Sequence, residues 1–315
     1  MRSPEVPAGA KVIHTFAEYD QICQAFLQGQ ISTLLIIGRP GIGKTEIFRR
    51  NIDPDVATIF RGHITPFRFF CECFSQLGKL ILLDDAEGLW GDRTGRRLIR
   101  ALSEVSSTKR LAWATTSKLL EREQVPQAFD TQSRLCMICN RFTSGSNAET
   151  EAILDRAVTV SFNPTVQELY QWGATWFWDQ EIFDYIGERL RFLAGISGRM
   201  LVTASQLKCS GIDWKPYVDE HALDISCLAV QELESSGMDA ERKIQNFIER
   251  TGGSRATYYR IRSRLAATGQ LDLGTFQPVK LVNDPPSTPS LIETVRMSQQ
   301  RVADYRQGSV QLTKR

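Results

Sequence analysis

The sequence predicts an α/β protein: a three-layer domain built on a parallel sheet, followed by a group of helices and a small basic helical domain. Over about the first 160 residues, short apolar runs alternate with segments whose apolar residues recur at helical spacing. This alternation is typical of a parallel sheet covered by helices. From about Thr165 the strand pattern ends. Residues 239–270 then form a short helical segment that is rich in Lys and Arg.

The composition indicates a folded, nearly neutral protein. Of 315 residues, 42% are hydrophobic and 23% are charged, which excludes a largely disordered chain. With 38 Lys and Arg against 36 Asp and Glu, the net charge is only +2, so any nucleic-acid-binding surface must be local. The apolar runs are too short to cross a bilayer, and the N-terminus lacks the apolar core of a signal peptide. The seven Cys residues do not suggest a disulfide framework, so we expect a cytoplasmic protein.

Six apolar segments are expected as strands. Residues 31–38 form a continuous apolar run, as expected for a strand that is buried on both faces. The other expected strands are residues 56–62, 79–83, 111–117, 134–140 and 157–162. Helices are expected at 44–52, from Pro66, and at 94–105, 148–156, 165–177, 179–195 and 198–208.

Residues 38–45 read GRPGIGKT and match the G-x-x-x-x-G-K-[ST] pattern of a phosphate-binding P-loop. They follow an expected strand and open an expected helix, which is the context that this pattern requires. Glycines let the backbone wrap around phosphate oxygens, and the helix N-terminus points its N–H groups at negative charge. Lys44 is expected to reach the β- and γ-phosphates of ATP, and Thr45 to supply an oxygen to Mg²⁺. The expected nucleotide contacts are Gly38, Arg39, Pro40, Gly41, Ile42, Gly43, Lys44 and Thr45.

A pair of carboxylates follows the apolar run 79–83. Because ligands of open α/β sheets bind at the carboxyl ends of the strands, Asp84 and Asp85 are expected at that edge. We expect Asp84 to lie on the Mg²⁺ side of the nucleotide and Asp85 to orient the attacking water. Glu87 is the next acidic residue and the alternative base.

With the P-loop and the acidic pair, the chain resembles the AAA+ ATPase family over about residues 31–215. The resemblance implies ATP hydrolysis, Mg²⁺ as cofactor, and a homo-oligomer in the form of a ring or filament. The usual acidic pair of the family is Asp-Glu, whereas Asp85 here is one methylene shorter. Hydrolysis is therefore expected to be slow or to depend on assembly.

The resemblance also implies three further roles for polar side chains. Asn140, in RLCMICNR, resembles the family's sensor 1 residue, with Thr116 as the alternative. Arg156 resembles the arginine finger, which acts on a neighbouring subunit; if Thr116 is sensor 1, Arg134 takes that role instead. Arg199, at the start of a lid helix, resembles the sensor 2 arginine.

Residues 239–269 have the pattern of a helix-turn-helix. Two glycines, Gly252 and Gly253, separate two helical patterns, and Ser254 is a natural N-cap for the second helix. Apolar residues at helical spacing are Ile244, Phe247 and Ile248 on the first helix and Tyr258, Ile261 and Leu265 on the second. We therefore expect the second helix to expose Ala256, Tyr259, Arg260 and Ser263.

Between residues 241 and 265 there are seven Lys or Arg and two Glu, which favours DNA binding. The stretch SRATYYRIRSRL resembles recognition helices of resolvase-like and transposon-associated domains. Arg255, Tyr259 and Arg260 are expected to reach base edges, and Arg262 and Arg264 to meet phosphates. The alternative is a solvated basic helix hairpin that extends the lid.

The patterns divide the chain into five regions. These are an N-terminal segment (1–30), an AAA+ nucleotide-binding domain (31–163), an α-helical lid (164–237), a helix-turn-helix domain (238–272), and a linker and tail (273–315). The tail residues 291–315 are a candidate protein-binding segment. Three lid tryptophans, Trp172, Trp176 and Trp178, suggest either a base-stacking platform or core and subunit contacts, and we favour the second interpretation.

The expected function is that of an ATP-dependent DNA-binding ATPase. By analogy of fold, such proteins act in DNA replication, helicase loading or transposition, often on mobile elements. One rival is an ATP-gated DNA-binding regulator with little turnover, which the Asp85 substitution favours. A small-molecule kinase would use the same P-loop, but it explains neither Arg199 nor the basic helix pair.

Overall fold

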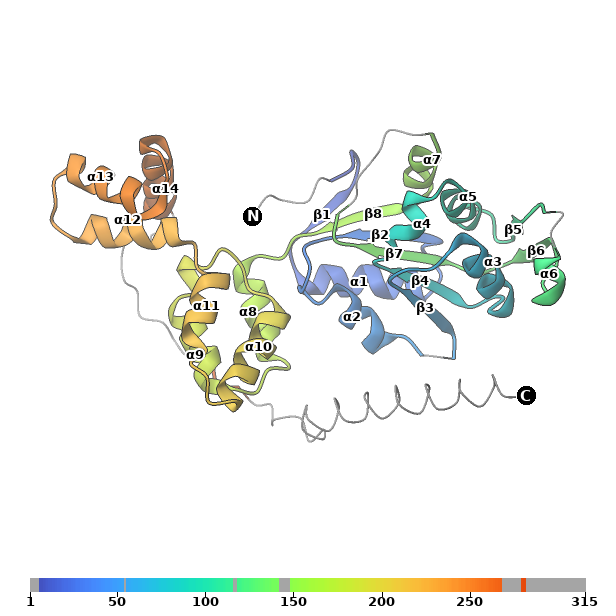
Figure 1. Cartoon of the computed structure of the whole chain (residues 1–315), viewed down its shortest axis with the longest axis horizontal. Helices are drawn as coiled ribbons and strands as arrows, with labels where there is room; N and C mark the ends of the chain where they lie inside the picture. Colours follow the sequence, from blue (N-terminus) through green and yellow to red (C-terminus); the bar gives the residue numbers. More distant parts are fainter. Residues whose placement is uncertain (1–5, 54, 116–117, 142–147, 268–278, 282–315) are drawn as a thin grey trace, which may run out of the picture.

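The computed structural model describes residues 6–53, 55–115, 118–141, 148–267 and 279–281. Three parts follow one another along the long axis of the molecule (Figure 1): the sheet domain, a group of helices that we call the lid, and a three-helix unit. The strands are β1 (Lys11–Ile13), β2 (Thr33–Ile37), β3 (Ala57–Arg61), β4 (Leu80–Asp84), β5 (Lys109–Ala112), β6 (Ala128–Thr131), β7 (Leu135–Cys139) and β8 (Val158–Phe162). The helices of the sheet domain are α1 (Phe16–Leu27), α2 (Lys44–Asn51), α3 (Pro66–Ser75), α4 (Glu87–Gly91), α5 (Arg93–Leu102), α6 (Leu119–Arg122) and α7 (Ala148–Arg156).

Six strands form one sheet in the order β1-β8-β2-β7-β4-β3, and every pair is parallel. The predicted α/β class with a parallel sheet is therefore confirmed. Strand β7 lies between β2 and β4, with Ile37 paired to Cys139 and Asp84 paired to Ile138. The residues that follow these three strands thus meet at one edge of the sheet.

Helices cover both faces of the sheet. Leu34 and Ile36 of β2 pack into the same cluster as residues of α1 and α2, whereas Leu35 and Ile37 pack into the cluster that contains α3, α5 and α7. Successive side chains of a strand point to opposite faces. All five residues of β2 are buried, which explains why its sequence is continuously apolar rather than alternating.

Two expectations about the sheet domain are wrong. Residues 111–117 do not add a strand to the parallel sheet, because β5 ends at Ala112 and pairs antiparallel with β6 in a separate two-stranded sheet. Along β5 only Lys109 and Leu111 are buried, the alternation of a strand with one covered face. Residues 11–27 of the predicted N-terminal segment (1–30) also belong to this domain, since β1 pairs with β8 and α1 covers the sheet.

The lid consists of helices that pack onto the α1 and α2 side of the sheet. They are α8 (Val166–Ala174), α9 (Gln180–Glu188), the 3₁₀ helix η1 (Leu190–Phe192), α10 (Gly198–Cys209) and α11 (Lys215–Ala222). Their apolar residues, such as Phe177 and Phe183, join the same core cluster as Leu34 and Ile36. The lid and the sheet domain therefore share one core.

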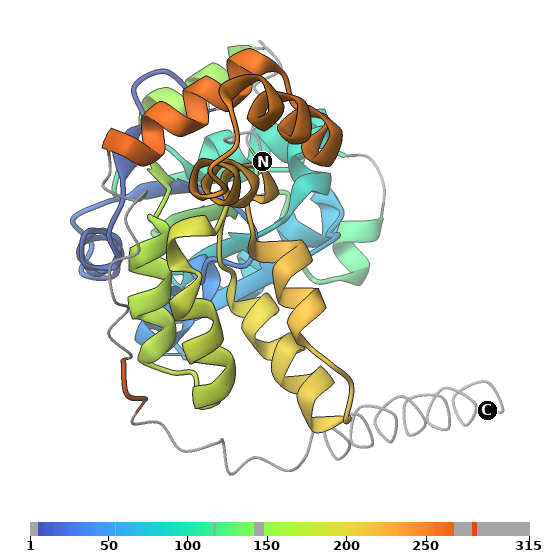
Figure 2. The same cartoon turned by 90° about the vertical axis from the view of Figure 1, so that its left-hand side faces the viewer.

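The three-helix unit has a core of its own. Helices α12 (Ile225–Ser235), α13 (Ala240–Thr251) and α14 (Arg255–Ala267) bury Val230, Leu233, Phe247, Tyr258 and Ile261 against one another. The predicted boundary at residue 237 is therefore one helix too late, because α12 belongs to this unit and not to the lid. Figure 2 views the molecule from the end that carries this unit.

The lid passes directly into the three-helix unit. Leu193 and Leu223 form an antiparallel bridge, flanked by hydrogen bonds from Ala194 N to Ala222 O (2.7 Å) and from Asp224 N to Phe192 O (2.7 Å). The Asp224 side chain then accepts from Cys227 N at 3.2 Å and caps α12. No helix of the described ranges combines the length and the apolar character that a bilayer span requires.

Candidate functional site

The glycine-rich loop 38–45 connects β2 to α2 at the carboxyl edge of the sheet. Gly41 and Gly43 have φ of 77° and 87°, a left-handed conformation that strains other residues. A Cβ on Gly38 would lie 2.6 Å from Phe162 O, and one on Gly43 would lie 2.7 Å from the Trp172 ring. The glycines are therefore needed both for the turn and for close contact with β8 and the lid.

Lys44 is the buried cation at the centre of this edge. Its side chain is only 6% exposed, and its Nζ donates to Gly38 O (2.7 Å), Arg39 O (2.8 Å) and Asn140 Oδ1 (3.0 Å). Burial lowers the pKa of Lys44 to about 8, against the opposing effect of the Asp85 and Asp84 carboxylates. A cation with so little access to water interacts strongly with any anion that reaches the loop.

The second group of polar atoms surrounds Asp84 at the end of β4. The Thr45 hydroxyl donates to Asp84 Oδ1 at 2.8 Å, and Arg61 Nε lies 3.4 Å from Asp84 Oδ2. A hydroxyl and a carboxylate so close together are oxygen ligands of the type that Mg²⁺ prefers. Both residues predicted for a magnesium site thus lie together, and their donor set fits the ion.

Arg61 is a site residue that the sequence analysis missed. It ends β3 and lies opposite Asp84 in the parallel register of β3 and β4. Its guanidinium, on a side chain that is 50% exposed, faces the same cavity as Thr45 and Lys44. Only the register between two strands could have identified it, because nothing in the local sequence around Arg61 marks it.

Asn140 bridges the two halves of the site. It follows β7, the strand between β2 and β4, and its Nδ2 donates to Asp85 Oδ1 at 2.9 Å while its Oδ1 accepts from Lys44. Asp85 itself has a φ of 52°. This value is uncommon for a residue other than glycine, and such backbone conformations cluster at functional sites. The alternative sensor residue, Thr116, lies outside the described residues. Glu87, the alternative base, opens α4.

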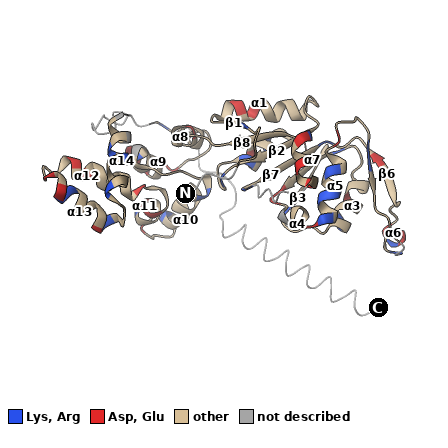
Figure 3. Ribbon diagram, turned by 90° about the horizontal axis from the view of Figure 1, so that it is seen from above, with Lys and Arg blue, Asp and Glu red and all other residues tan. Residues whose placement is uncertain are grey.

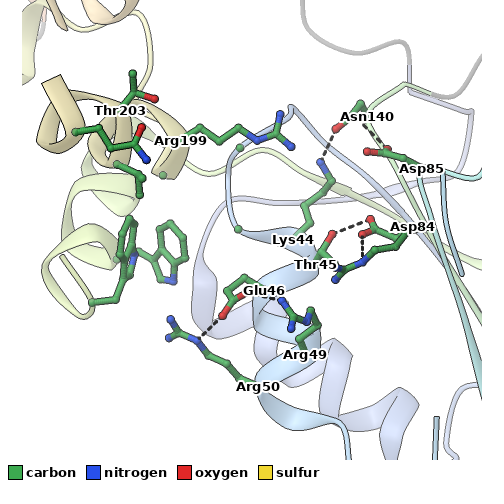
Figure 4. A pocket seen from close by; sticks show the side chains of 18 residues that line it. Lys44, Thr45, Glu46, Arg49, Arg50, Asp84, Asp85, Asn140, Arg199 and Thr203 are labelled. Carbon is green, nitrogen blue, oxygen red and sulfur yellow. Dashed lines mark hydrogen bonds and ion pairs between the residues drawn. The ribbon is translucent and has the colours of Figure 1, made fainter. Parts of the chain in front are cut away.

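These groups line a cavity of about 670 Å³ between the loop, the strand ends and the lid (Figure 4). That volume is within the usual range for small-molecule sites. Arg199 stands in the first turn of α10 and reaches from the lid toward the loop. The lid is also joined to the loop by a hydrogen bond from Gly198 N to Gly41 O at 2.8 Å.

The remaining loop residues face a second cavity. Arg39, Pro40 and Ile42 line a space of about 540 Å³ on the side of α11, and Asn140 and Arg199 line both cavities. Burial lowers the pKa of Arg39, and its Nε has no hydrogen-bond partner within the described part of the chain. None of these three predicted nucleotide contacts lines the first cavity, and Gly38 does not line it either.

Neither candidate for the arginine finger lines the cavity of its own chain. Arg156 precedes β8 and Arg134 precedes β7, so both lie at the edge of the sheet opposite the loop. Arg156 donates to Arg100 O at 3.3 Å. Arg134 donates to the carbonyls of Phe26 and, at 3.1 Å, Leu27. Arg134 thus holds the end of α1 against the sheet, which is a structural role.

Several local features predicted for residues 239–269 are present in α13 and α14, although Ile248 is exposed rather than packed with Ile244 and Phe247. Helix α13 ends at Gly252, which has a φ of 66°, and the Ser254 hydroxyl accepts from Thr257 N at 3.2 Å. Tyr258, Ile261 and Leu265 are buried. Among the described side chains of α14, the exposed ones are Arg255, Ala256, Tyr259, Arg260, Arg262, Ser263 and Ala266.

The five predicted DNA contacts are not equivalent in the structure. Arg255 lies 5.9 Å from the centre of the Tyr259 ring, and Arg260 is exposed beside them. Arg262 Nε, in contrast, is 3.2 Å from the Glu234 carboxylate of α12. The side chain of Arg264 lies outside the described residues. Figure 3 shows that charges of both signs occur on α12 and α13, whereas the sequence of α14 contains Arg but no Asp or Glu.

A scan against protein-family models gives no match for this chain, and a search of the curated proteins also gives none.

Proposed function

We propose that the chain is an ATP-dependent DNA-binding ATPase of the AAA+ type, in which 38–45 is the P-loop, α8–α11 form the lid, and α13 and α14 form a helix-turn-helix. The observation that carries the proposal is the connected set Lys44–Asn140–Asp85 beside the pair Thr45–Asp84, at one edge of a parallel sheet. Three separate strands contribute to this set, so a chance glycine-rich turn does not explain it.

In the proposed reaction the loop N–H groups and Lys44 bind the β- and γ-phosphates. Lys44 Nζ exchanges its bonds to the carbonyls of Gly38 and Arg39 for phosphate oxygens. Thr45 and Asp84 would hold Mg²⁺, and the bound ion would neutralise charge on the phosphates. Asp85 orients the attacking water as its general base, and Asn140 fixes the Asp85 carboxylate through the 2.9 Å hydrogen bond.

One observation favours the rival function, an ATP-gated DNA-binding regulator with little turnover. Asp85 is shorter than Glu, and one of its oxygens already accepts from Asn140. The test is ATP hydrolysis by the full chain with and without duplex DNA. Hydrolysis that DNA stimulates and that Lys44→Ala abolishes supports a motor. ATP binding without hydrolysis supports the regulator, and absence of ATP binding refutes both.

The proposal includes a homo-oligomer, as the AAA+ resemblance implies, because neither Arg156 nor Arg134 lines the cavity of its own chain. Arg156 of a neighbouring copy then stabilises charge on the transferring phosphoryl group, an effect worth about 10³–10⁵ in rate in other enzymes. Mixing Arg156→Ala with Lys44→Ala should restore turnover at mixed interfaces. An active monomer would contradict this.

DNA is the proposed partner of α14. Arg255, Tyr259 and Arg260 are exposed on the face opposite the buried Tyr258 and Ile261, and an exposed basic helix after a tight turn is suited to the major groove. Arg260→Ala should weaken duplex binding by about 1–3 kcal/mol on a preferred site. The matched control is Arg242→Ala, which removes one exposed cation from α13. Equal losses in both variants would refute the special role of α14.

By analogy of fold, the AAA+ resemblance implies a role in DNA replication, helicase loading or transposition. The tail residues 291–315, proposed to bind a protein partner, lie outside the described residues.

A further inference from the structure

The lid end of the 670 Å³ cavity is lined by two tryptophans. Trp172 belongs to α8, and Trp176 follows the end of that helix by two residues. Their ring centres are 5.2 Å apart and the rings are tilted by 57°. Trp178 does not line the cavity; it packs against Phe177, with ring centres 5.3 Å apart. The three lid tryptophans therefore do not share one role.

Trp172 stands directly beside the loop. Phe16 covers one face of its ring, with centres 5.0 Å apart and planes within 10°. A Cβ on Gly43 would lie 2.7 Å from Trp172 Cζ2, so the indole touches the loop backbone one residue before Lys44. The aromatic wall thus begins where the cationic part of the cavity ends.

Trp176 has the properties of a binding residue as well as of a core residue. Its ring lies against Gly198, where a Cβ would be 3.3 Å from Cζ2. Its Nε1 is buried and has no hydrogen-bond partner within the described ranges, although buried indole N–H groups usually find one. Leaving such a donor unpaired is unfavourable, and an acceptor on a ligand in the adjacent cavity would remove that cost.

The two ends of the cavity differ in chemistry. Lys44, Arg61 and the two aspartates lie at the strand ends. The lid contributes Arg199 and, beside the tryptophans, Val202, Thr203 and Gln206, while Glu46, Arg49 and Arg50 of α2 also line the cavity. Thr203 lies across the cavity from Asp84 (Figure 4). The end at the strands suits a ligand's anionic chain, and the end at the lid suits a flat, uncharged aromatic ring with hydrogen-bonding edges. A nucleoside triphosphate has both.

We propose that Trp172 and Trp176 form the base-binding wall of the nucleotide site, against which a purine ring packs while Thr203 and Gln206 meet its polar edge. This inference rests on the proposed nucleotide-binding function of the loop. Contact between a base and an aromatic side chain is worth about 1–3 kcal/mol elsewhere. The wall therefore accounts for affinity that the phosphates alone do not provide.

Inorganic tripolyphosphate separates the two ends of the site, because it has the phosphate chain of ATP and no base. Binding of Mg-ATP and of tripolyphosphate is measured by calorimetry for the unmodified protein, Trp176→Ala, Trp176→Phe and the control Trp178→Phe. Trp176→Ala should weaken ATP binding by at least about fivefold and change tripolyphosphate binding less than twofold. Trp176→Phe should retain most of the affinity, and the control should resemble the unmodified protein.

Four outcomes overturn the proposal. If Trp176→Ala loses the same affinity for ATP and for tripolyphosphate, Trp176 stabilises the loop and does not contact the base. If the ATP affinity of Trp176→Ala is unchanged, Trp176 does neither. If the unmodified protein binds neither ligand, the nucleotide-binding function itself fails. If it binds tripolyphosphate as tightly as ATP, only the base wall fails.

A second measurement needs no variant. ATP should change the tryptophan fluorescence of the unmodified protein, whereas tripolyphosphate at saturation should change it much less. Identical changes with both ligands would contradict the wall, because the response would then come from the loop or the lid.

Discussion

The buried Lys44 makes a specific prediction about how ATP binding depends on pH. Burial lowers the pKa of Lys44 from its ordinary value of 10.5 to about 8. Only the protonated amine attracts phosphate oxygens, so affinity should be complete below pH 7 and should fall as the pH rises through 8. An unshifted lysine would remain charged throughout this range.

The magnitude follows from the protonated fraction. With a pKa of about 8, this fraction is about 0.9 at pH 7 and about 0.1 at pH 9. The affinity for ATP should therefore fall about tenfold, which corresponds to about 1.4 kcal/mol. The terminal phosphate does not cause this decrease, because a phosphate with a second pKa of about 6 is already ionised at pH 7.

The assay is equilibrium binding of a fluorescent ATP analogue with Mg²⁺ at pH 7, 8 and 9. The matched control is Lys44→Arg, because a guanidinium stays charged at all three values and its profile should be flat, whatever its absolute affinity. Equal affinities of the unmodified protein at pH 7 and pH 9 would refute the reasoning, as would a parallel decrease in the arginine variant.

Three further predictions concern single side chains. Asp85→Asn should lower hydrolysis by about 10²–10⁴-fold and leave ATP binding within about threefold; normal turnover would move the base to Glu87. Glu234→Gln should lower the free energy of unfolding of the three-helix unit by about 1–3 kcal/mol, because Glu234 accepts from Tyr258 Oη and lies 3.2 Å from Arg262 Nε. Hydrogen exchange in α13 and α14 would detect this, and unchanged protection would contradict it. Lys109 is 2% exposed, donates to Ser133 O at 2.8 Å, and has a pKa lowered by burial to about 8. Between pH 8 and 10 the unfolded chain binds more protons at Lys109 than the folded chain does. The free energy of unfolding of the unmodified protein, relative to that of Lys109→Met, should therefore rise by up to about 3 kcal/mol over this range. Urea denaturation at several pH values measures both free energies, and the same pH dependence in the two proteins would refute the prediction.

The parts of the fold that could be predicted from sequence are those with strong local patterns. Strands β2, β4 and β7 are buried on both faces, and such strands are recognisable as continuous apolar runs. The predicted positions of Lys44, Thr45 and Asp84 depend on a motif and on strand ends, and the structure brings these residues together.

The missed features depend on contacts between distant segments. Strand β1 has only three residues, which are too few to show the alternation of apolar and polar residues that identifies a strand. Arg61 enters the site through the register of β3 with β4. Helix α12 has an apolar face like that of a lid helix, and only its partners assign it to the three-helix unit. Trp172 and Trp176 could not be distinguished from Trp178 by spacing, because the cavity that separates them is formed by tertiary packing.

The bridge between Leu193 and Leu223 has a consequence for how the two proposed ligands affect each other. Asp224 bonds to η1 through its backbone and caps α12 through its side chain, so a rotation of the lid would carry α14 with it as one body. Gly41 O, in turn, holds the start of α10. If ATP rotates the lid and so changes the affinity for DNA by some factor, DNA must change the affinity for ATP by the same factor. Each ligand would then act as an allosteric effector of the other, and the rigidity of the bridge between Leu193 and Leu223 would set the size of the coupling.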